Sequence, residues 1–361
     1  MQGKMGLLLL AAAFSAAVFM QMAVATNVVP AIYVFGDSTA DVGNNNFLPG
    51  NQAKANFAHN GIDFPGGTPT GRFSNGYNGI DYLAKKLRFK KSPPAYLSIT
   101  REAMLYRGAN FASGGSGILD ATGRNISISL NQQIKDYEEI TRHLKSRVGA
   151  TAADRFLSKS LFIFSTGNND MLGFYTVFGL KNATQQDLLI GQLANQFKNQ
   201  LQTLYNLGAR KFVVFGASRL GCVPTLRRAI PSGECAEDLN KLSQQFNKAT
   251  EAVLHSLAST LKGFSYSFIK VYDIISVVSS NPTKYGFTDL VSACCGSGKF
   301  NAESSCTPNA TYCSNRDQYF YWDRLHPTQA TSRLISNTAF RGRKYTTPVT
   351  VEQLADSRRR Y

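Results

Sequence analysis

Short runs of hydrophobic residues recur along the chain, and longer segments with helical periodicity separate them. In these segments hydrophobic residues return every three or four positions, most clearly over 188–207 and 239–261, which predicts helices. Strands that alternate with helices predict right-handed crossovers and a parallel sheet covered on both faces. We therefore expect one three-layer α/β domain over residues 26–361. The runs that we predict to be strands are 31–35, 106–112, 161–166, 211–216 and 268–272.

The first residues have the pattern of a cleaved secretory signal peptide. Lys4 precedes a hydrophobic run over 6–20, and Ala23-Val24-Ala25 supplies the small residues that signal peptidase requires. The alternative is an uncleaved membrane anchor, although the run is slightly short for one and Gln21 follows it. No later segment is long and hydrophobic enough to span a bilayer. We predict that residues 1–25 are removed and that the protein is secreted.

The chain is strongly basic, with 39 lysines and arginines against 23 acidic residues and a formal net charge of +16. Such an excess favours contact with polyanions. For a secreted protein these are acidic polysaccharides, such as those of a cell wall, or lipid headgroups, and no nucleic-acid-binding motif is present. The alternative is a solvated basic surface without a specific partner.

An even number of cysteines in a secreted chain predicts disulfides rather than a metal site. The six cysteines, all in the C-terminal half, are Cys222, Cys235, Cys294, Cys295, Cys306 and Cys313. We expect the first two to pair with each other, while the adjacent middle two each pair with one of the last two in an order that stays open. Zinc is disfavoured, because none of the four histidines has ligand spacing to a cysteine pair. No cofactor is expected.

Three N-glycosylation sequons fit the same secretory route. They begin at Asn125, Asn182 and Asn309. A three-residue motif also arises by chance, so each sequon is only a candidate site. We predict that glycans are attached to these asparagines during secretion.

Polar and glycine-rich turns follow three of the predicted strands. Ser38 comes two residues after Gly36, a glycine-rich turn spans 113–117, and Asn169 lies in Gly167-Asn168-Asn169-Asp170. Ligands of open α/β sheets bind outside the carboxyl ends of the strands. We therefore expect a nucleophilic hydroxyl, backbone N–H donors and a side-chain amide along one edge of the sheet. Taken singly, each turn is more typical of a structural role than of a functional one.

A nucleophilic serine requires a base, because its hydroxyl is a weak acid at neutral pH. His59 lies in a predicted loop, while His143 and His255 lie on predicted helices. His326 differs, because Asp323 precedes it by three residues and a single turn can bring the carboxylate back to the imidazole. We therefore predict His326 as the base and Asp323 as its partner.

These residues, in this order and context, resemble the GDSL esterase/lipase family of SGNH hydrolases. The blocks that carry the resemblance are FGDS, NFASGGSG, GNND and DRLHPT, and they contain Ser38, Gly115, Asn169, and Asp323 with His326. Segments such as DVGNNN and GIDFPGGTPTGRFSNG are similar to the secreted plant branch of the family. The resemblance implies a flavodoxin-like α/β/α sandwich with a mainly parallel, five-stranded sheet.

The resemblance also implies ester hydrolysis through an acyl-enzyme. Ser38 would be the nucleophile and a backbone oxyanion donor, Gly115 a second backbone donor, Asn169 a side-chain donor, His326 the base and Asp323 its orienting partner. The substrate would be a lipid or an acylated polysaccharide of the apoplast or cell wall. Two alternatives stay open, namely an acyltransferase with the same triad and a non-catalytic wall-binding protein that retains the fold.

Three further features concern the surroundings of this site. Arg72 and Phe73 form part of the pocket rim or cross the sheet edge, and we favour the second interpretation. Trp322 shapes the acyl pocket or packs beneath the loop of His326. The segment 56–60 departs from the Tyr-Pro-Pro-Tyr-like sequence that is more common in the family, which puts the pocket rim in doubt.

Overall fold

The computed structural model describes residues 28–50, 53–100, 106–179 and 182–356. The predicted signal peptide, residues 1–25, lies outside the described residues. Within the described ranges, no helix combines the length and hydropathy that a bilayer span requires.

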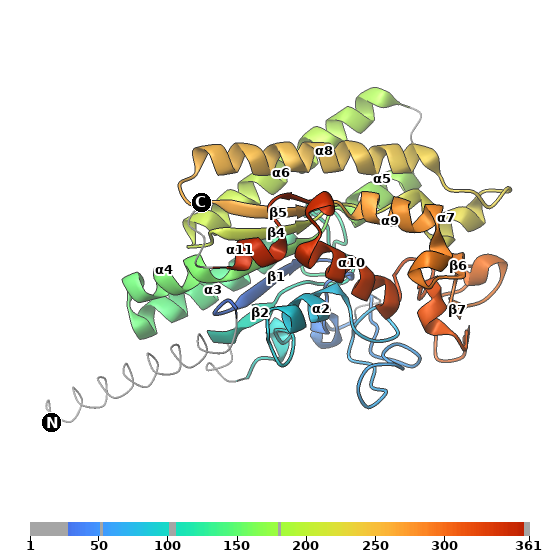
Figure 1. Ribbon diagram of the computed structural model, residues 1–361, viewed down its shortest axis with the longest axis horizontal. Helices are drawn as coiled ribbons and strands as arrows, with labels where there is room; N and C mark the ends of the chain where they lie inside the picture. The colour runs from blue at the N-terminus through green and yellow to red at the C-terminus, as the bar shows by residue number, and fades with distance from the viewer. Residues whose placement is uncertain (1–27, 51–52, 101–105, 180–181, 357–361) are drawn as a thin grey trace, which may run out of the picture.

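A six-stranded sheet forms the centre of the described chain (Figure 1). Its strands are β1 (Ile32–Gly36), β2 (Gly108–Asn110), β3 (Leu161–Ser165), β4 (Lys211–Phe215), β5 (Ser265–Ile269) and β10 (Thr346–Pro348). The order is β10-β5-β4-β3-β1-β2, and β1 to β5 run parallel. This is the 2-1-3-4-5 order of flavodoxin-like folds, so the predicted fold class is confirmed.

Two details of the predicted sheet are corrected. A sixth strand, β10, pairs antiparallel with β5 at the sheet edge. The strand that we predicted over 268–272 lies at Ser265–Ile269, because Ser265 and Ser267 alternate with Tyr266 and Phe268. The hydrophobic residues after Ile269 belong instead to the helix that begins at Val271.

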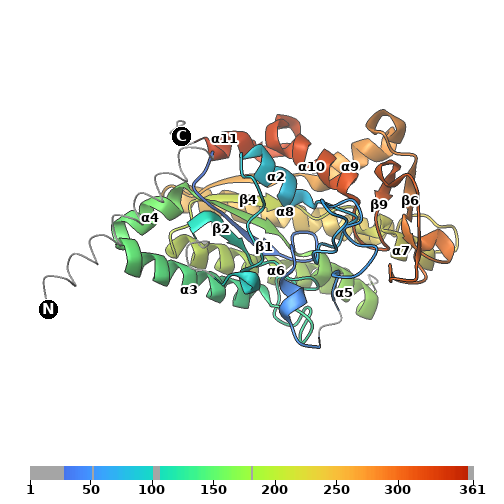
Figure 2. The same ribbon diagram turned by 90° about the horizontal axis from the view of Figure 1, so that it is seen from below.

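Alternate residues of the central strands enter two different cores. Along β1, Tyr33 and Phe35 pack on one face of the sheet, while Ile32 and Val34 pack on the other. The first face is covered by α3 (Leu130–Val148), α4 (Ala150–Lys159), α5 (Asn168–Phe178), α6 (Ala183–Asn206) and α8 (Glu237–Thr260). The second is covered by α2 (Gly79–Lys86), α9 (Val271–Ser280), α10 (Gln329–Arg341) and α11 (Val351–Ala355). Figure 2 shows these two helical layers on opposite sides of the sheet.

The two helices with the clearest sequence periodicity are present. The prediction over 239–261 corresponds to α8, and that over 188–207 corresponds to α6. Helix α6 begins five residues earlier than predicted, because the side chain of Asn182 caps it by accepting a hydrogen bond from the backbone N–H of Gln185 at 3.3 Å.

The disulfides stabilise a region of short elements at one end of the molecule (Figure 1). Its elements are α7 (Pro224–Ala229), β6 (Asp289–Ala293), β7 (Cys295–Gly296), β8 (Thr311–Tyr312) and β9 (Tyr319–Tyr321). Cys222 pairs with Cys235 as predicted. The order left open is now assigned, with Cys294 bonded to Cys313 and Cys295 bonded to Cys306.

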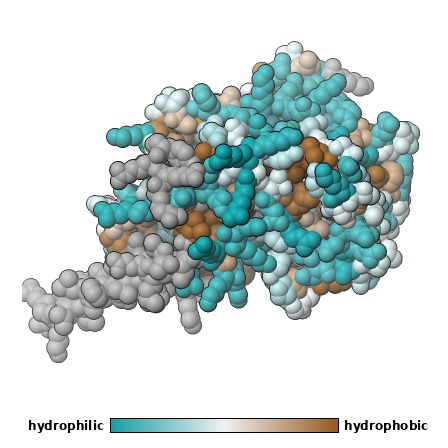
Figure 3. All heavy atoms as spheres, in the orientation of Figure 1, coloured by the Kyte–Doolittle hydropathy of each residue, from teal (hydrophilic) through white to brown (hydrophobic). Residues whose placement is uncertain are grey.

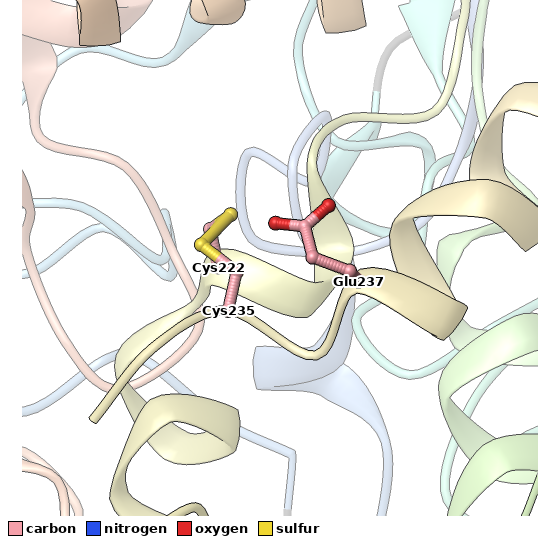
Figure 4. A group of neighbouring side chains, drawn as sticks. All are labelled: Cys222, Cys235 and Glu237. Carbon is pink, nitrogen blue, oxygen red and sulfur yellow. A yellow bond between two sulfur atoms is a disulfide. The ribbon is translucent and has the colours of Figure 1, made fainter. Parts of the chain in front are cut away.

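One group of potential metal ligands accompanies the first disulfide. Glu237 lies beside the sulfur atoms of Cys222 and Cys235 (Figure 4). These sulfurs are bonded to each other, so neither is the thiolate that a metal requires, and a single exposed carboxylate remains. The group therefore gives no reason to infer a metal site.

The surface seen in Figure 3 is mainly hydrophilic, with hydrophobic side chains gathered in small patches. This distribution agrees with the burial of both cores between the sheet and its helices. A larger cluster of exposed hydrophobic side chains among the described residues would therefore indicate a binding site.

Candidate active site

Ser38 lies in the turn that follows β1, next to the end of β3. The backbone N–H of Asp37 donates to the carbonyl of Ser165 at 3.0 Å, which holds the turn against β3. Gly36 is required at this position, because its φ is +141° and an added Cβ would collide with the same carbonyl. Among the described residues, the backbone N–H of Ser38 has no acceptor, so it is available to a ligand.

His326 and Asp323 lie in one tight turn between β9 and α10. Asp323 Oδ1 accepts hydrogen bonds from the backbone N–H groups of Leu325 and His326, both at 2.8 Å. The imidazole Nδ1 lies 2.8 Å from Asp323 Oδ2, so the carboxylate fixes the tautomer with the hydrogen on Nδ1. The backbone N–H of Trp322 donates to the carbonyl of His326 at 2.8 Å and closes the turn.

Ser38 and His326 touch, although 288 positions separate them in the sequence. The distance from Ser38 Oγ to His326 Nε2 is 2.8 Å. Since Nδ1 carries the hydrogen, Nε2 is the acceptor and the serine hydroxyl donates. A serine, an imidazole and a carboxylate in this chain of hydrogen bonds can transfer a proton away from the hydroxyl.

The imidazole and the carboxylate stabilise each other's charged forms. Their side chains are only 13% and 14% exposed, and burial by itself disfavours both charges. Burial is outweighed by the attraction between the two groups, together with the backbone hydrogen bonds to Asp323 and the Asp37 carboxylate near His326. These interactions raise the pKa of His326 above the 6.5 of an ordinary histidine and lower the pKa of Asp323 below 3.8.

This raised pKa predicts the acid limb of the pH–rate profile. Only the neutral imidazole accepts a proton, so kcat/KM should fall as the pH drops through the pKa of His326. We expect the midpoint of this fall above pH 6.5. The measurement is kcat/KM for a short p-nitrophenyl ester from pH 5 to 9, with the non-enzymatic rate subtracted.

A second carboxyl group titrates nearby and provides the control. Burial raises the pKa of Asp37 to about 6, and its carboxylate also raises the pKa of His326. Asp37→Asn keeps the side-chain oxygen that accepts from Thr39 and removes the titration. The acid limb should persist in this variant, with its midpoint shifted slightly lower. If the fall in kcat/KM at low pH disappeared in Asp37→Asn, the titration of Asp37, rather than that of His326, would cause it.

Two buried aspartates hold the glycine-rich turn after β2 from opposite sides. Asp41 Oδ2 accepts from the backbone N–H of Gly114 at 3.0 Å. Asp170 accepts from the backbone N–H groups of Ile118 at 2.8 Å and Leu119 at 3.1 Å. Gly115 lies between these anchors with φ +93°, and among the described residues its N–H has no acceptor. This N–H is therefore available to a ligand.

Asn169 lies in the first turn of α5, directly after β3. Its amide Nδ2 donates to the carbonyl of Ser116 at 2.8 Å, which uses one of its two hydrogens and orients the other. Asn169 lines a cavity together with Ser38 and His326, and lines a second groove together with Gly115. Asn169 therefore lies between the cavity and the groove.

The cavity beside Ser38 and His326 has a volume of about 130 Å³ and is mainly hydrophobic. It extends between α9 and α10, where Val271, Ile275 and Ile335 contribute to its wall. An apolar cavity of about 150 Å³ can hold a molecule the size of benzene. The cavity therefore accommodates a small apolar group next to the serine.

The structure shows two contacts at the site that the sequence analysis did not predict. The contacts of Thr39 were missed, and Phe73 was given a structural role at the sheet edge. Thr39 donates its hydroxyl hydrogen to Asp37 at 2.6 Å, so Ser165, 2.7 Å from Thr39, is the donor in that pair. The ring of Phe73 packs on the imidazole of His326, with centroids 4.9 Å apart. Phe73 therefore supports the histidine. In the sequence, only the position of Thr39 next to Ser38 in Gly36-Asp37-Ser38-Thr39 could have indicated its contacts.

The other singled-out residues lie outside the site. Trp322 is fully buried beneath the His326 loop, and its Nε1–H donates to Asn60 Oδ1 at 2.9 Å. His59, from the segment that departs from the family pattern, packs on Tyr312 with ring centroids 4.4 Å apart. Neither Asn60 nor His59 lines the cavity or the groove. The segment 56–60, which departs from the family pattern, therefore contributes to packing near the disulfides.

The remaining predicted positions do not line the cavity or the groove. His143 and His255 lie on α3 and α8 as predicted. The three sequon asparagines, Asn125, Asn182 and Asn309, are all exposed. Arg72 is buried and pairs with Asp81 at 2.8 Å, which agrees with the structural role that we favoured for it.

Comparison with known proteins gives a consistent result. A family model described as GDSL-like Lipase/Acylhydrolase matches residues 32–338. A GDSL esterase/lipase of Arabidopsis thaliana is 37% identical over 342 residues, which cover 91% of this chain and 90% of the relative. GDSL esterase/lipase 7 of the same plant is 36% identical over 344 residues, covering 90% and 92%.

A solved structure described as a GDSL-like lipase, from Parabacteroides merdae, is more distant. It is 14% identical with a TM-score of 0.39, over 86% of this chain and 93% of that one. The family model and the plant relatives each span most of the chain, including the positions of Ser38 and His326. The chain therefore belongs to the GDSL esterase/lipase family of ester hydrolases.

Proposed function

We propose that this protein is a secreted carboxylic-ester hydrolase that cleaves acyl esters of lipids or cell-wall material through an acyl-enzyme on Ser38. The observation that carries the proposal is the 2.8 Å contact between Ser38 Oγ and His326 Nε2. It joins a hydroxyl and a base that lie at opposite ends of the matched segment, and the raised pKa of His326 makes it a stronger base.

The first half of the reaction forms the acyl-enzyme. His326 Nε2 takes the proton of Ser38 as Oγ attacks the ester carbonyl, and Asp323 stabilises the resulting imidazolium. The carbonyl oxygen becomes negative in the tetrahedral intermediate. The N–H groups of Ser38 and Gly115 and the second amide hydrogen of Asn169 donate to this oxygen. His326 then protonates the leaving alcohol, and the carbon–oxygen bond to the alcohol breaks.

The second half releases the acid. His326 takes a proton from water, which attacks the acyl carbon of the ester on Ser38 through the same oxyanion donors. The imidazolium then returns its proton to Ser38 Oγ, and the carboxylic acid leaves. An alcohol in place of water would make the same machinery an acyltransferase.

Secretion and a cell-wall location rest on features outside the site. Disulfides are typical of oxidising compartments, and the structure pairs all six cysteines. The sequon asparagines are exposed, which glycosylation requires. The net charge of +16 favours a location near acidic wall polysaccharides.

The test is covalent labelling with a fluorophosphonate probe, followed by a panel of esters that varies the acyl chain and the alcohol. We expect the secreted wild-type protein to be labelled and Ser38→Ala, used as the blank, to show neither labelling nor turnover. Folded wild-type protein that reacts with neither the probe nor any ester would favour the non-catalytic alternative. Transfer of the acyl group to glycerol in preference to water would favour the acyltransferase.

A further inference from the structure

Exposed large hydrophobic side chains gather at one place on the described surface. Seven such residues are exposed by more than a third, and four of them line a single groove. These four are Ile126 (39%), Val177 (71%), Phe178 (62%) and Leu188 (61%). Single exposed hydrophobic residues are common on protein surfaces, but a contiguous cluster indicates a binding site.

The groove lies between α5, the first turns of α6 and the loop 115–126. Its volume of about 680 Å³ falls in the range of roughly 300–1,000 Å³ that is typical of ligand sites. Asp170 is the only charged side chain among its lining residues. Its carboxylate is already occupied by Ile118, Leu119 and Thr122. The groove therefore suits an uncharged, hydrophobic occupant.

The groove adjoins the active site, because Asn169 lines both the groove and the cavity beside Ser38. Gly115 and Asn169, which provide two of the oxyanion donors, form part of its wall. Ser38 and His326 do not line the groove, whereas both line the smaller cavity. The leaving alcohol must lie near His326 Nε2, because that atom protonates it. The alcohol therefore faces the cavity, and the acyl chain faces the groove.

We propose that this groove binds the long hydrocarbon acyl chain of the substrate and that Gly173 keeps it open. The proposal rests on the proposed function and specifies its substrate as an ester of a long-chain acid. Gly173 lies inside α5, where glycine is a poor helix former, and it lines the groove. An added Cβ there meets nothing within 4 Å, so a larger side chain can start in open space at the groove wall.

The test compares Gly173→Phe with the wild type on monomeric p-nitrophenyl laurate and p-nitrophenyl butyrate. We expect the ratio of the two kcat/KM values, laurate over butyrate, to fall about tenfold or more, mainly through KM, while butyrate hydrolysis changes less than about twofold. Gly191→Phe is the matched control. Gly191 is also an exposed helical glycine with no atom within 4 Å of an added Cβ, but it does not line the groove.

A second variant does not depend on tolerance of a bulky residue in α5. Leu188 is 61% exposed, so Leu188→Asp puts a charge in the groove without disturbing the core. It should lower the same ratio.

An unchanged ratio in both groove variants would overturn the proposal. Normal activity on monomeric laurate with loss only on lipid vesicles would show that the groove contacts a lipid surface instead. Failure of the proposed function is distinguishable, because the wild type would then hydrolyse neither p-nitrophenyl ester.

Discussion

Replacing Asp323 with Asn is expected to lower kcat for short p-nitrophenyl esters by about 10⁴-fold. The carboxylate accepts from Nδ1 of His326 at 2.8 Å, and this contact keeps Nε2 free to accept the proton of Ser38. An asparagine amide can present an N–H to Nδ1 and stabilise the opposite tautomer, in which Nε2 carries the hydrogen. The imidazole then cannot act as a base, and its cation loses its partner.

The matched control for this prediction is Asp317→Asn. Asp317 is an exposed aspartate six positions earlier in the same region, and it does not contact His326. It should retain activity within about twofold. In Asp323→Asn the residual activity should have its acid limb at lower pH, because the carboxylate no longer raises the pKa of His326. A loss below about tenfold in a variant with normal thermal stability would exclude Asp323 as the orienting group.

The central fold was predictable because its signals are local. The buried strands β1, β3 and β4 each contain four consecutive hydrophobic residues, as expected for parallel strands covered on both faces. Helices α6 and α8 have strong periodicity over 24 residues each. Their alternation with the strands was sufficient to predict a parallel sheet between two helical layers.

The edge of the sheet and the disulfide region were not predictable in the same way. Strand β10 has three residues, ends in Pro348 and pairs only with β5, so its sequence has no strand pattern. Strands β7 and β8 have two residues each. Their positions depend on the disulfides Cys294–Cys313 and Cys295–Cys306, whose pairing no spacing rule determines.

The site shows the same division between local motifs and long-range contacts. Ser38, Asn169 and His326 could be identified because each lies in a short motif at a strand or turn end. The groups that hold the oxyanion turn could not, because Asp41 reaches Gly114 across 73 positions and Asp170 reaches Ile118 across 52. The groove combines residues from three segments, so only the folded chain reveals it.

Replacing Asn169 with Ala is expected to reduce kcat by about 10²- to 10³-fold with little change in KM. Its amide is held by the carbonyl of Ser116 at 2.8 Å, and the second hydrogen is free to donate to the oxygen that becomes negative during the reaction. Because the charge exists only in the transition state and intermediate, loss of the donor should affect kcat rather than substrate binding. The measurement is steady-state hydrolysis of p-nitrophenyl butyrate.

A structural role for Asn169 would give a different result, because loss of its bond to Ser116 would then lower stability and activity together. Gln132→Ala provides the comparison. It removes an exposed amide that donates to Asp136 at 2.8 Å, outside the cavity and the groove, and should leave kcat within about twofold. We expect both variants to melt near the wild-type temperature and only Asn169→Ala to lose kcat. Unchanged turnover in Asn169→Ala would leave the backbone N–H groups of Ser38 and Gly115 as the oxyanion donors.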